Sequence, residues 1–128
     1  MKAKLEVIKG TNLKLFNANT STLLETLELG ASGYSGVMAN FHPELYVKLC
    51  NIYKENPSKA RKIADFLTVA SLIERQVYPV NAKFYQKSIG NFNSIMTRTR
   101  DIKELNATGI LEIQQFIRFN EEFEKTLG

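Results

Sequence analysis

The sequence is poor in the residues that most metal and redox sites require. It has one cysteine and one histidine among 128 residues. An internal disulfide is therefore excluded, and so are the paired cysteines or histidines of a zinc site. The single cysteine, Cys50, has Leu49 and Ile52 close by in sequence, which favours a small buried side chain on a helix over a nucleophile or a metal ligand. We expect no metal and no cofactor.

Long apolar runs are also missing. No stretch approaches the roughly 18 residues that a membrane span needs. The first ten residues alternate lysines with apolar residues, so they do not have the continuous apolar segment of a secretory signal. A lone cysteine fits a reducing compartment. These features predict a cytoplasmic protein without a membrane partner.

Charge of one sign is not concentrated anywhere in the chain. The net charge is +4, from 17 Lys and Arg against 13 Asp and Glu. The basic residues are scattered among glutamates, form no run, and do not alternate with aromatic residues. This pattern indicates a solvated surface and does not favour nucleic-acid binding.

The length limits the fold. A chain of 128 residues can form a modest core, and a hydrophobic fraction of 44% with 23% charged residues is ordinary for a globular protein. A complete (β/α)8 barrel needs about 250 residues. The chain is therefore expected to be ordered, but it cannot be such a barrel alone.

Two short strands are predicted in the first third of the chain. The segment Leu13–Phe16 has strand-like alternation, and Gly33–Met38 has few charges and two glycines. A polar turn and a helix lie between them. Thr22 with Glu25 fits a capping box at the start of this helix, and Gly30 is placed to end it.

The rest of the sequence favours helices. Apolar residues recur at helical spacing in several segments that are separated by proline or glycine. The segment 91–101 is predicted to be a loop. The expected helices begin at Pro43, after Asn56-Pro57, at Val80 (running to Ser88, with Gly90 after it) and near Thr108.

The order strand, helix, strand, helix and further helices indicates an α/β chain that is predominantly helical. Two parallel strands leave open edges and cannot close a barrel, so this order is typical of part of a larger design. We expect two parts, with residues 1–56 forming two β/α units and residues 57–128 forming a helical extension.

The segment from Leu29 to Pro43 reads LGASGYSGVMANFHP. It resembles the LGA-x-G-x-IS-x-x-AN-x-x-P pattern over the last barrel strand of the dihydrodipicolinate synthase / N-acetylneuraminate lyase family. Further segments resemble that family in the same order, and the resemblance extends from about Lys4 to Gly128. These segments are Lys59-Ala60-Arg61, Tyr78-Pro79-Val80-Asn81-Ala82-Lys83 and Met96-Thr97-Arg98-Thr99-Arg100.

The resemblance implies the C-terminal part of a TIM (β/α)8 barrel, namely its last two β/α units, followed by a C-terminal helical region. Leu13–Phe16 corresponds to the seventh strand and Tyr34–Val37 to the eighth. Substrates bind where the carboxyl ends of barrel strands meet. The residues expected to bind substrate are therefore Asn17, Ala18, Asn19, Thr20, Ser35, Gly36 and Val37.

The sequence departs from the family pattern at several of these positions. Ala18 replaces a glycine, and Thr20-Ser21 stand where the lyase branch has acidic residues. Ser35-Gly36 replace the isoleucine-serine pair of the synthases, which predicts more open space near the lysine arm.

The family's chemistry depends on a lysine that forms a Schiff base with a 2-keto acid, usually pyruvate, so that the iminium acts as an electron sink. This lysine belongs to the sixth strand, which precedes the matched segment. Lys83 matches a structural helix lysine, and Lys14 has no burial that favours a nucleophilic amine. We therefore predict no catalytic residue here: the chain is expected to be the C-terminal fragment of a pyruvate-dependent lyase or aldolase, inactive alone.

An alternative is a non-catalytic helical module for interaction or oligomerisation, derived from the same family. The aromatic stripe Phe116, Phe119 and Phe123 fits such a surface, although a core within the chain explains it equally well. Open strand edges and incompletely covered apolar faces also predict self-association. The only histidine, His42, precedes Pro43 and is interpreted as a helix-capping residue.

Overall fold

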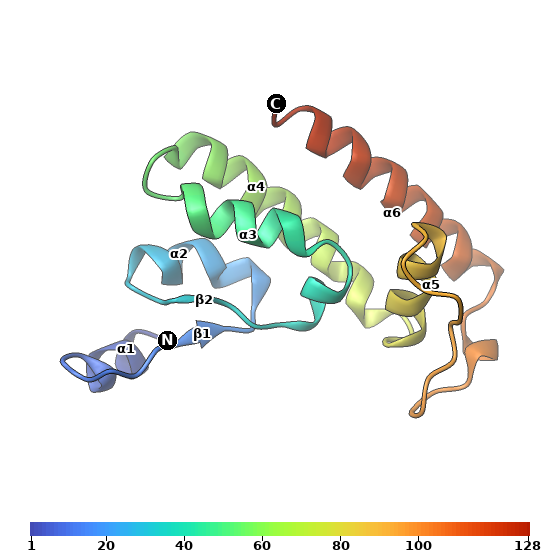
Figure 1. The fold of residues 1–128 in the computed structure, drawn as a ribbon, viewed down its shortest axis with the longest axis horizontal. Coiled ribbons are helices and arrows are strands. Elements are labelled where there is room, and N and C mark those ends of the chain that lie inside the picture. The colour runs from blue at the N-terminus through green and yellow to red at the C-terminus, as the bar shows by residue number, and fades with distance from the viewer. The chain divides into compact units, whose positions relative to one another are not determined.

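The computed structural model describes residues 1–128, which form two compact units, Met1–Ser71 and Leu72–Gly128. Both units are rich in helix, and the two strands lie in the first unit (Figure 1). The chain is therefore a helix-rich α/β protein, as the sequence predicts. The predicted division after residue 56 separates the β/α units from the helical extension. The two compact units divide the chain by a different criterion, so the predicted division stays a prediction.

The first unit contains a parallel pair of short strands. β1 (Phe16–Asn17) and β2 (Gly33–Tyr34) pair with Phe16 beside Gly33 and Asn17 beside Tyr34. Further backbone bonds extend the pairing at each end, because Ser32 N–H donates to the Leu15 carbonyl at 2.7 Å and Ser35 N–H donates to the Asn17 carbonyl at 2.9 Å. Two parallel strands that follow one another in the sequence and are joined through a helix form one β/α/β unit.

Both strands are shorter than predicted. The strand predicted over Leu13–Phe16 is limited to its last residue and the next one, and Leu13 is 68% exposed. The strand predicted over Gly33–Met38 ends at Tyr34, and the 3-10 helix η2 (Val37–Asn40) takes over. The physical reason is loss of pairing, because the chain after Asn17 turns into the 3-10 helix η1 (Thr20–Thr22) and offers no further partner to β2.

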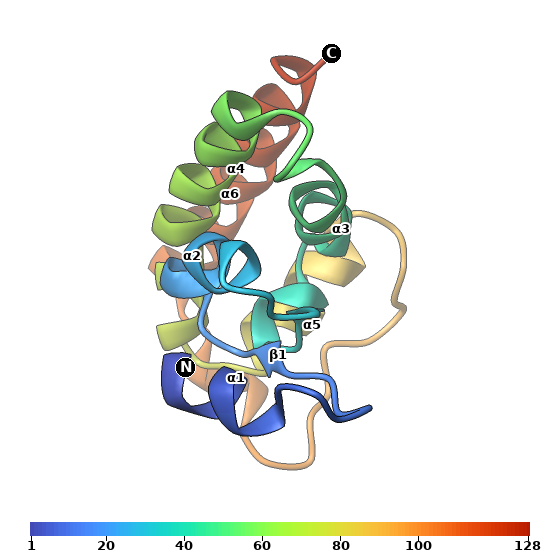
Figure 2. The same cartoon turned by 90° about the vertical axis from the view of Figure 1, so that its left-hand side faces the viewer.

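Helices α2 (Leu23–Glu28), α3 (Pro43–Ile52) and α4 (Pro57–Ala70) lie on one side of the strand pair (Figures 1 and 2). Pro43 and Pro57 occupy first-turn positions, as predicted, where the missing N–H has no intrahelical partner anyway. Their apolar faces form the core of the unit. Its fully buried side chains include Leu23, Met38, Phe41, Leu45, Leu49, Ile63 and Leu67.

The sequence reading missed or misassigned two features of the first unit. The helix α1 (Lys2–Ile8) was not predicted, because it has no buried residue and so no apolar stripe in its sequence. The predicted capping box of Thr22 with Glu25 is wrong: the Thr22 side chain does not cap α2. Instead, Asn19 caps η1 by accepting a hydrogen bond from Thr22 N–H at 3.2 Å. Gly30, at φ +101°, follows the helix as predicted.

The second unit consists of helices and a long loop. Helix α4 ends at Ala70, and the 3-10 helix η3 (Ser71–Arg75) follows it. Helix α5 (Val80–Ser88) has the predicted bounds, and the following loop has no regular structure until the 3-10 helix η4 (Ile102–Glu104). The Lys83 amine donates a hydrogen bond to the Met96 carbonyl and so anchors this loop to α5.

The last helix, α6 (Ala107–Lys125), begins near the predicted residue. Asn106 caps it by accepting a hydrogen bond from Gly109 N–H at 2.9 Å. The aromatic stripe is divided, because Phe116 is buried against Tyr85, with ring centroids 5.5 Å apart, whereas Phe119 is 56% exposed. Charged residues recur along the whole of α6, and none of the helices could span a bilayer.

Candidate functional site

The predicted substrate-binding residues lie on two segments that follow neighbouring strands. One segment, residues 17–20, leaves β1, and the other, residues 35–37, leaves β2. Because the strands are parallel and in register, both segments leave at the same end of the pair. The structure thus brings the two predicted groups together. Ala18, Asn19, Ser35 and Val37 are exposed, Gly36 is partly buried, and Asn17 and Thr20 are buried.

The buried Asn17 side chain fixes the first segment. Its amide Nδ2 donates to the hydroxyls of Thr22 at 3.0 Å and Thr26 at 2.9 Å. Its Oδ1 accepts from Asn19 N–H at 2.8 Å. Both amide protons are therefore committed to neighbours on η1 and α2, and the side chain faces the helices. Asn17 holds the loop shape rather than presenting its own amide at the strand ends.

Thr20 lies at the centre of a hydroxyl cluster. Its Oγ1 is 2.8 Å from the Tyr46 hydroxyl and 3.2 Å from the Tyr34 hydroxyl. The rings of Tyr34 and Tyr46 stack, with centroids 4.0 Å apart and planes 15° apart. The loop after β1 is thereby connected to β2 and to α3. The sequence pattern did not predict this contact, which brings together residues up to 26 positions apart.

Gly36 accommodates the Tyr34 hydroxyl. A Cβ placed on Gly36 would overlap that hydroxyl and would lie 2.6 Å from the Ala18 carbonyl oxygen. The expectation that Ser35-Gly36 leave open space is therefore wrong at Gly36. The space left by the absent side chain of Gly36 is filled by the phenol of Tyr34 and by the Ala18 backbone of the first loop.

The single histidine, His42, and the single cysteine, Cys50, belong to the same part of the first unit: His42 immediately precedes α3, and Cys50 lies within it. His42 occupies the residue before α3, but its side chain makes no capping bond and is buried near the rings of Tyr46 and Phe66. Burial raises the pKa of the partly buried Cys50 thiol, and a hydrogen bond with the Tyr34 backbone offsets this in part. A raised pKa keeps the thiol protonated, so it is a weak nucleophile at neutral pH.

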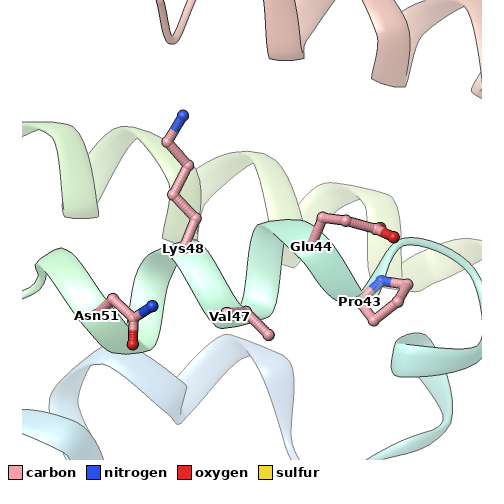
Figure 3. Close-up of a pocket in the computed structure, with 5 residues that line it drawn as sticks. All are labelled: Pro43, Glu44, Val47, Lys48 and Asn51. Carbon is pink, nitrogen blue, oxygen red and sulfur yellow. The ribbon is translucent and has the colours of Figure 1, made fainter.

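Two surface hollows lie away from the strand ends. One, of about 490 Å³, runs along the outer face of α3 and is lined by Pro43, Glu44, Val47, Lys48 and Asn51 (Figure 3). The other, of about 430 Å³, lies in the second unit, where Arg75 and the start of α6 contribute to its wall. Neither includes a predicted substrate-binding residue.

The parallel β/α/β unit, with exposed loops at the carboxyl ends of its strands, places the chain in the α/β class whose sites form at strand ends. Comparison with protein families matches residues 2–99 to the Dihydrodipicolinate synthetase family, and the chain belongs to that family. No curated protein and no solved structure matches the chain.

Proposed function

We propose that the chain is the C-terminal part of a 2-keto-acid lyase or aldolase barrel, to which it contributes the last two strands and a helical extension. The observation that carries the proposal is the in-register parallel pairing of Phe16 with Gly33 in a chain of this family. The resemblance implies a lyase or aldolase, and a parallel pair joined through a helix is the repeating element of a (β/α)8 barrel.

The side chains of the strand pair fit a barrel wall. Successive residues of a strand point to opposite faces. Asn17 bonds to Thr26 of α2 and Tyr34 stacks on Tyr46 of α3, so these side chains face the helices. Phe16 therefore lies on the opposite face, where it is 49% exposed. In a closed barrel, this face lines the interior, and a large apolar residue there is covered by side chains from the other strands.

A two-stranded sheet also has two open edges. Unpaired strand edges accept further strands of the same or another chain, and closure into a barrel removes them. We infer that β1 and β2 pair with strands of the first six β/α units, carried on preceding polypeptide or on a partner chain. Without them, the same edges and the exposed Leu13 and Phe16 favour self-association.

The proposed ligand is the carboxylate end of a 2-keto acid such as pyruvate. Ala18, Asn19, Ser35 and Val37 are exposed at the strand ends and Gly36 is partly exposed, while the buried Asn17 and Thr20 hold the first loop in place. The Asn19 and Ser35 N–H groups already donate to Asn17, so the backbone N–H groups of Ala18, Gly36 and Val37 are the ones proposed to stabilise negative charge on a bound substrate. In the full enzyme, a lysine amine from an earlier strand adds to the keto carbonyl, water leaves, and the resulting iminium accepts electrons from the neighbouring carbon.

The experiment is borohydride trapping with pyruvate. The purified chain is incubated alone, and with a polypeptide of this family that carries the first six β/α units, and adducts are located by mass spectrometry. We expect no adduct on the isolated chain and an adduct on the partner's lysine only when both are present. A matched control replaces Phe16 with Asp, which places a charge on the apolar face and prevents assembly.

A helical interaction module is the second candidate. The observation that favours it is the exposure of Leu111 and Phe119 on α6, 51% and 56%. Light scattering of the Phe16→Asp and Phe119→Asp variants separates the two candidates. Loss of self-association with Phe16→Asp alone supports the barrel piece, whereas loss with Phe119→Asp alone supports the helical module.

A further inference from the structure

We infer that Tyr34 is a positioning residue for the proposed keto-acid site, and that the absence of a side chain at Gly36 leaves the space for the Tyr34 hydroxyl. This inference rests on the proposed function for its ligand, while the contact itself is given by the structure. Tyr34 lies outside the set of residues that the sequence suggested. It nevertheless contacts members of that set on both loops.

The first loop contacts Tyr34 through Thr20. The two hydroxyl oxygens are 3.2 Å apart, and the Tyr46 hydroxyl approaches Thr20 from the other side at 2.8 Å. Thr20 is buried, so solvent does not compete strongly for these bonds. The segment Ala18–Thr20 is therefore held by a side chain that belongs to the opposite strand.

The second loop contacts Tyr34 through Gly36. Any side chain at this position would collide with the Tyr34 hydroxyl and approach the Ala18 carbonyl to 2.6 Å. Tyr34 and Gly36 therefore function as a pair: the glycine leaves the space, and the phenol fills it while bonding across to the first loop. The φ of Gly36 is −142°, which any residue can adopt, so the requirement for glycine comes from this contact and not from the backbone.

The ring orientation of Tyr34 is fixed independently of its hydroxyl. The ring stacks on Tyr46 at 4.0 Å, and Tyr46 is itself buried on α3. Removing only the hydroxyl, as in Tyr34→Phe, therefore leaves the stack in place and releases the bond to Thr20 alone. The distance between the accessible backbones of the two loops, at Ala18–Asn19 and Ser35–Val37, then becomes less well defined.

The experiment combines a double-mutant cycle with a ligand titration on the intact chain. The cycle compares urea midpoints for wild type, Tyr34→Phe, Gly36→Ala and the double variant. The phenylalanine ring lacks the oxygen that lies nearest the new methyl group, so Gly36→Ala is expected to lower the midpoint less in the Tyr34→Phe background. The relief is partial, because the ring Cζ at 2.5 Å and the Ala18 carbonyl oxygen at 2.6 Å still oppose the methyl group. Tyr53→Phe, which changes a tyrosine at the end of α3 that belongs to neither loop, serves as the matched control and should be additive with Gly36→Ala.

In the titration, pyruvate is added to 15N-labelled chain, alone and with the polypeptide that carries the first six β/α units, while the amides of Ala18, Asn19, Ser35 and Val37 are observed. We expect Tyr34→Phe to weaken binding about three- to tenfold, the equivalent of one hydrogen bond, with Tyr53→Phe unchanged. Additive effects of Tyr34→Phe and Gly36→Ala would overturn the inference even if pyruvate binds. A coupled cycle with no pyruvate shift in any chain, alone or with that polypeptide, supports the contact between the loops but refutes the keto-acid site, and with it the positioning role.

Discussion

Asn17 donates a hydrogen bond from its amide to the Thr26 hydroxyl at 2.9 Å, which ties the last residue of β1 to the middle of α2. The same amide donates to Thr22, and its oxygen accepts from Asn19 N–H. One buried side chain thus determines how the chain leaves the strand. The loop at the proposed site has its shape because of this residue.

Replacing Asn17 by alanine should destabilise the first unit. The change leaves the buried Thr26 hydroxyl without this partner, which is unfavourable, and it also removes the bonds to the exposed Thr22 hydroxyl and Asn19 N–H. We expect a loss of about 1–3 kcal/mol in the free energy of unfolding, measured in urea. Asn12→Ala, at an exposed position, is the control and should change it by less than about 0.5 kcal/mol. Equal effects of the two variants would contradict the assignment.

The Cys50 thiol should react slowly. Because burial raises its pKa above the ordinary 9.0, little thiolate is present at pH 8. Iodoacetamide should therefore modify the folded chain more slowly than the same chain in urea. The folded state also holds its proton more tightly than the unfolded state, so stability should fall as pH rises through and above 9.0. Cys50→Ser should show a smaller fall between pH 8 and pH 10; an identical fall would argue against the raised pKa.

Lys83 should prove structural. Its amine donates to the Met96 carbonyl, so Lys83→Met frees the loop of residues 91–101 without touching the strand ends. We expect faster amide hydrogen exchange in this loop and little change elsewhere. Lys87→Met, on the same helix, is the control. Reductive trapping of pyruvate on Lys83 would instead make it a carbonyl-reactive amine and would refute the structural role.

Asn56 should contribute to the start of α4. It accepts a hydrogen bond from Lys59 N–H at 3.0 Å and precedes Pro57. Asn56→Ala removes this cap and should lower the free energy of unfolding by about 1 kcal/mol, whereas Asn56→Asp should retain most of it. Thermal or urea unfolding followed by circular dichroism provides the measurement. A neutral alanine variant would show that the cap is dispensable.

The starts and ends of several helices could be predicted from the sequence, because proline, asparagine and glycine act through local geometry. Pro43, Pro57 and Gly90 lie where the pattern placed them. The strands were harder to predict, since their length depends on pairing partners that one segment does not specify. The capping box failed for a related reason: Asn19 was an equally suitable cap three residues earlier, and it serves η1 in the structure.

The proximity of the two loops at the proposed site was predictable, but the contacts between them were not. Strand order alone brings residues 17–20 beside residues 35–37. The role of Tyr34 depends on stacking with Tyr46, which lies 12 residues further along on another element, and on the collision that reserves Gly36 for glycine. Neither contact has a signature in local spacing, so each required the folded structure.

Trapping with pyruvate and borohydride tests the central proposal most directly. The proposal predicts that the isolated chain carries no adduct, and that an adduct forms on a partner's lysine when the first six β/α units are supplied. An adduct on any lysine of the isolated chain would contradict it.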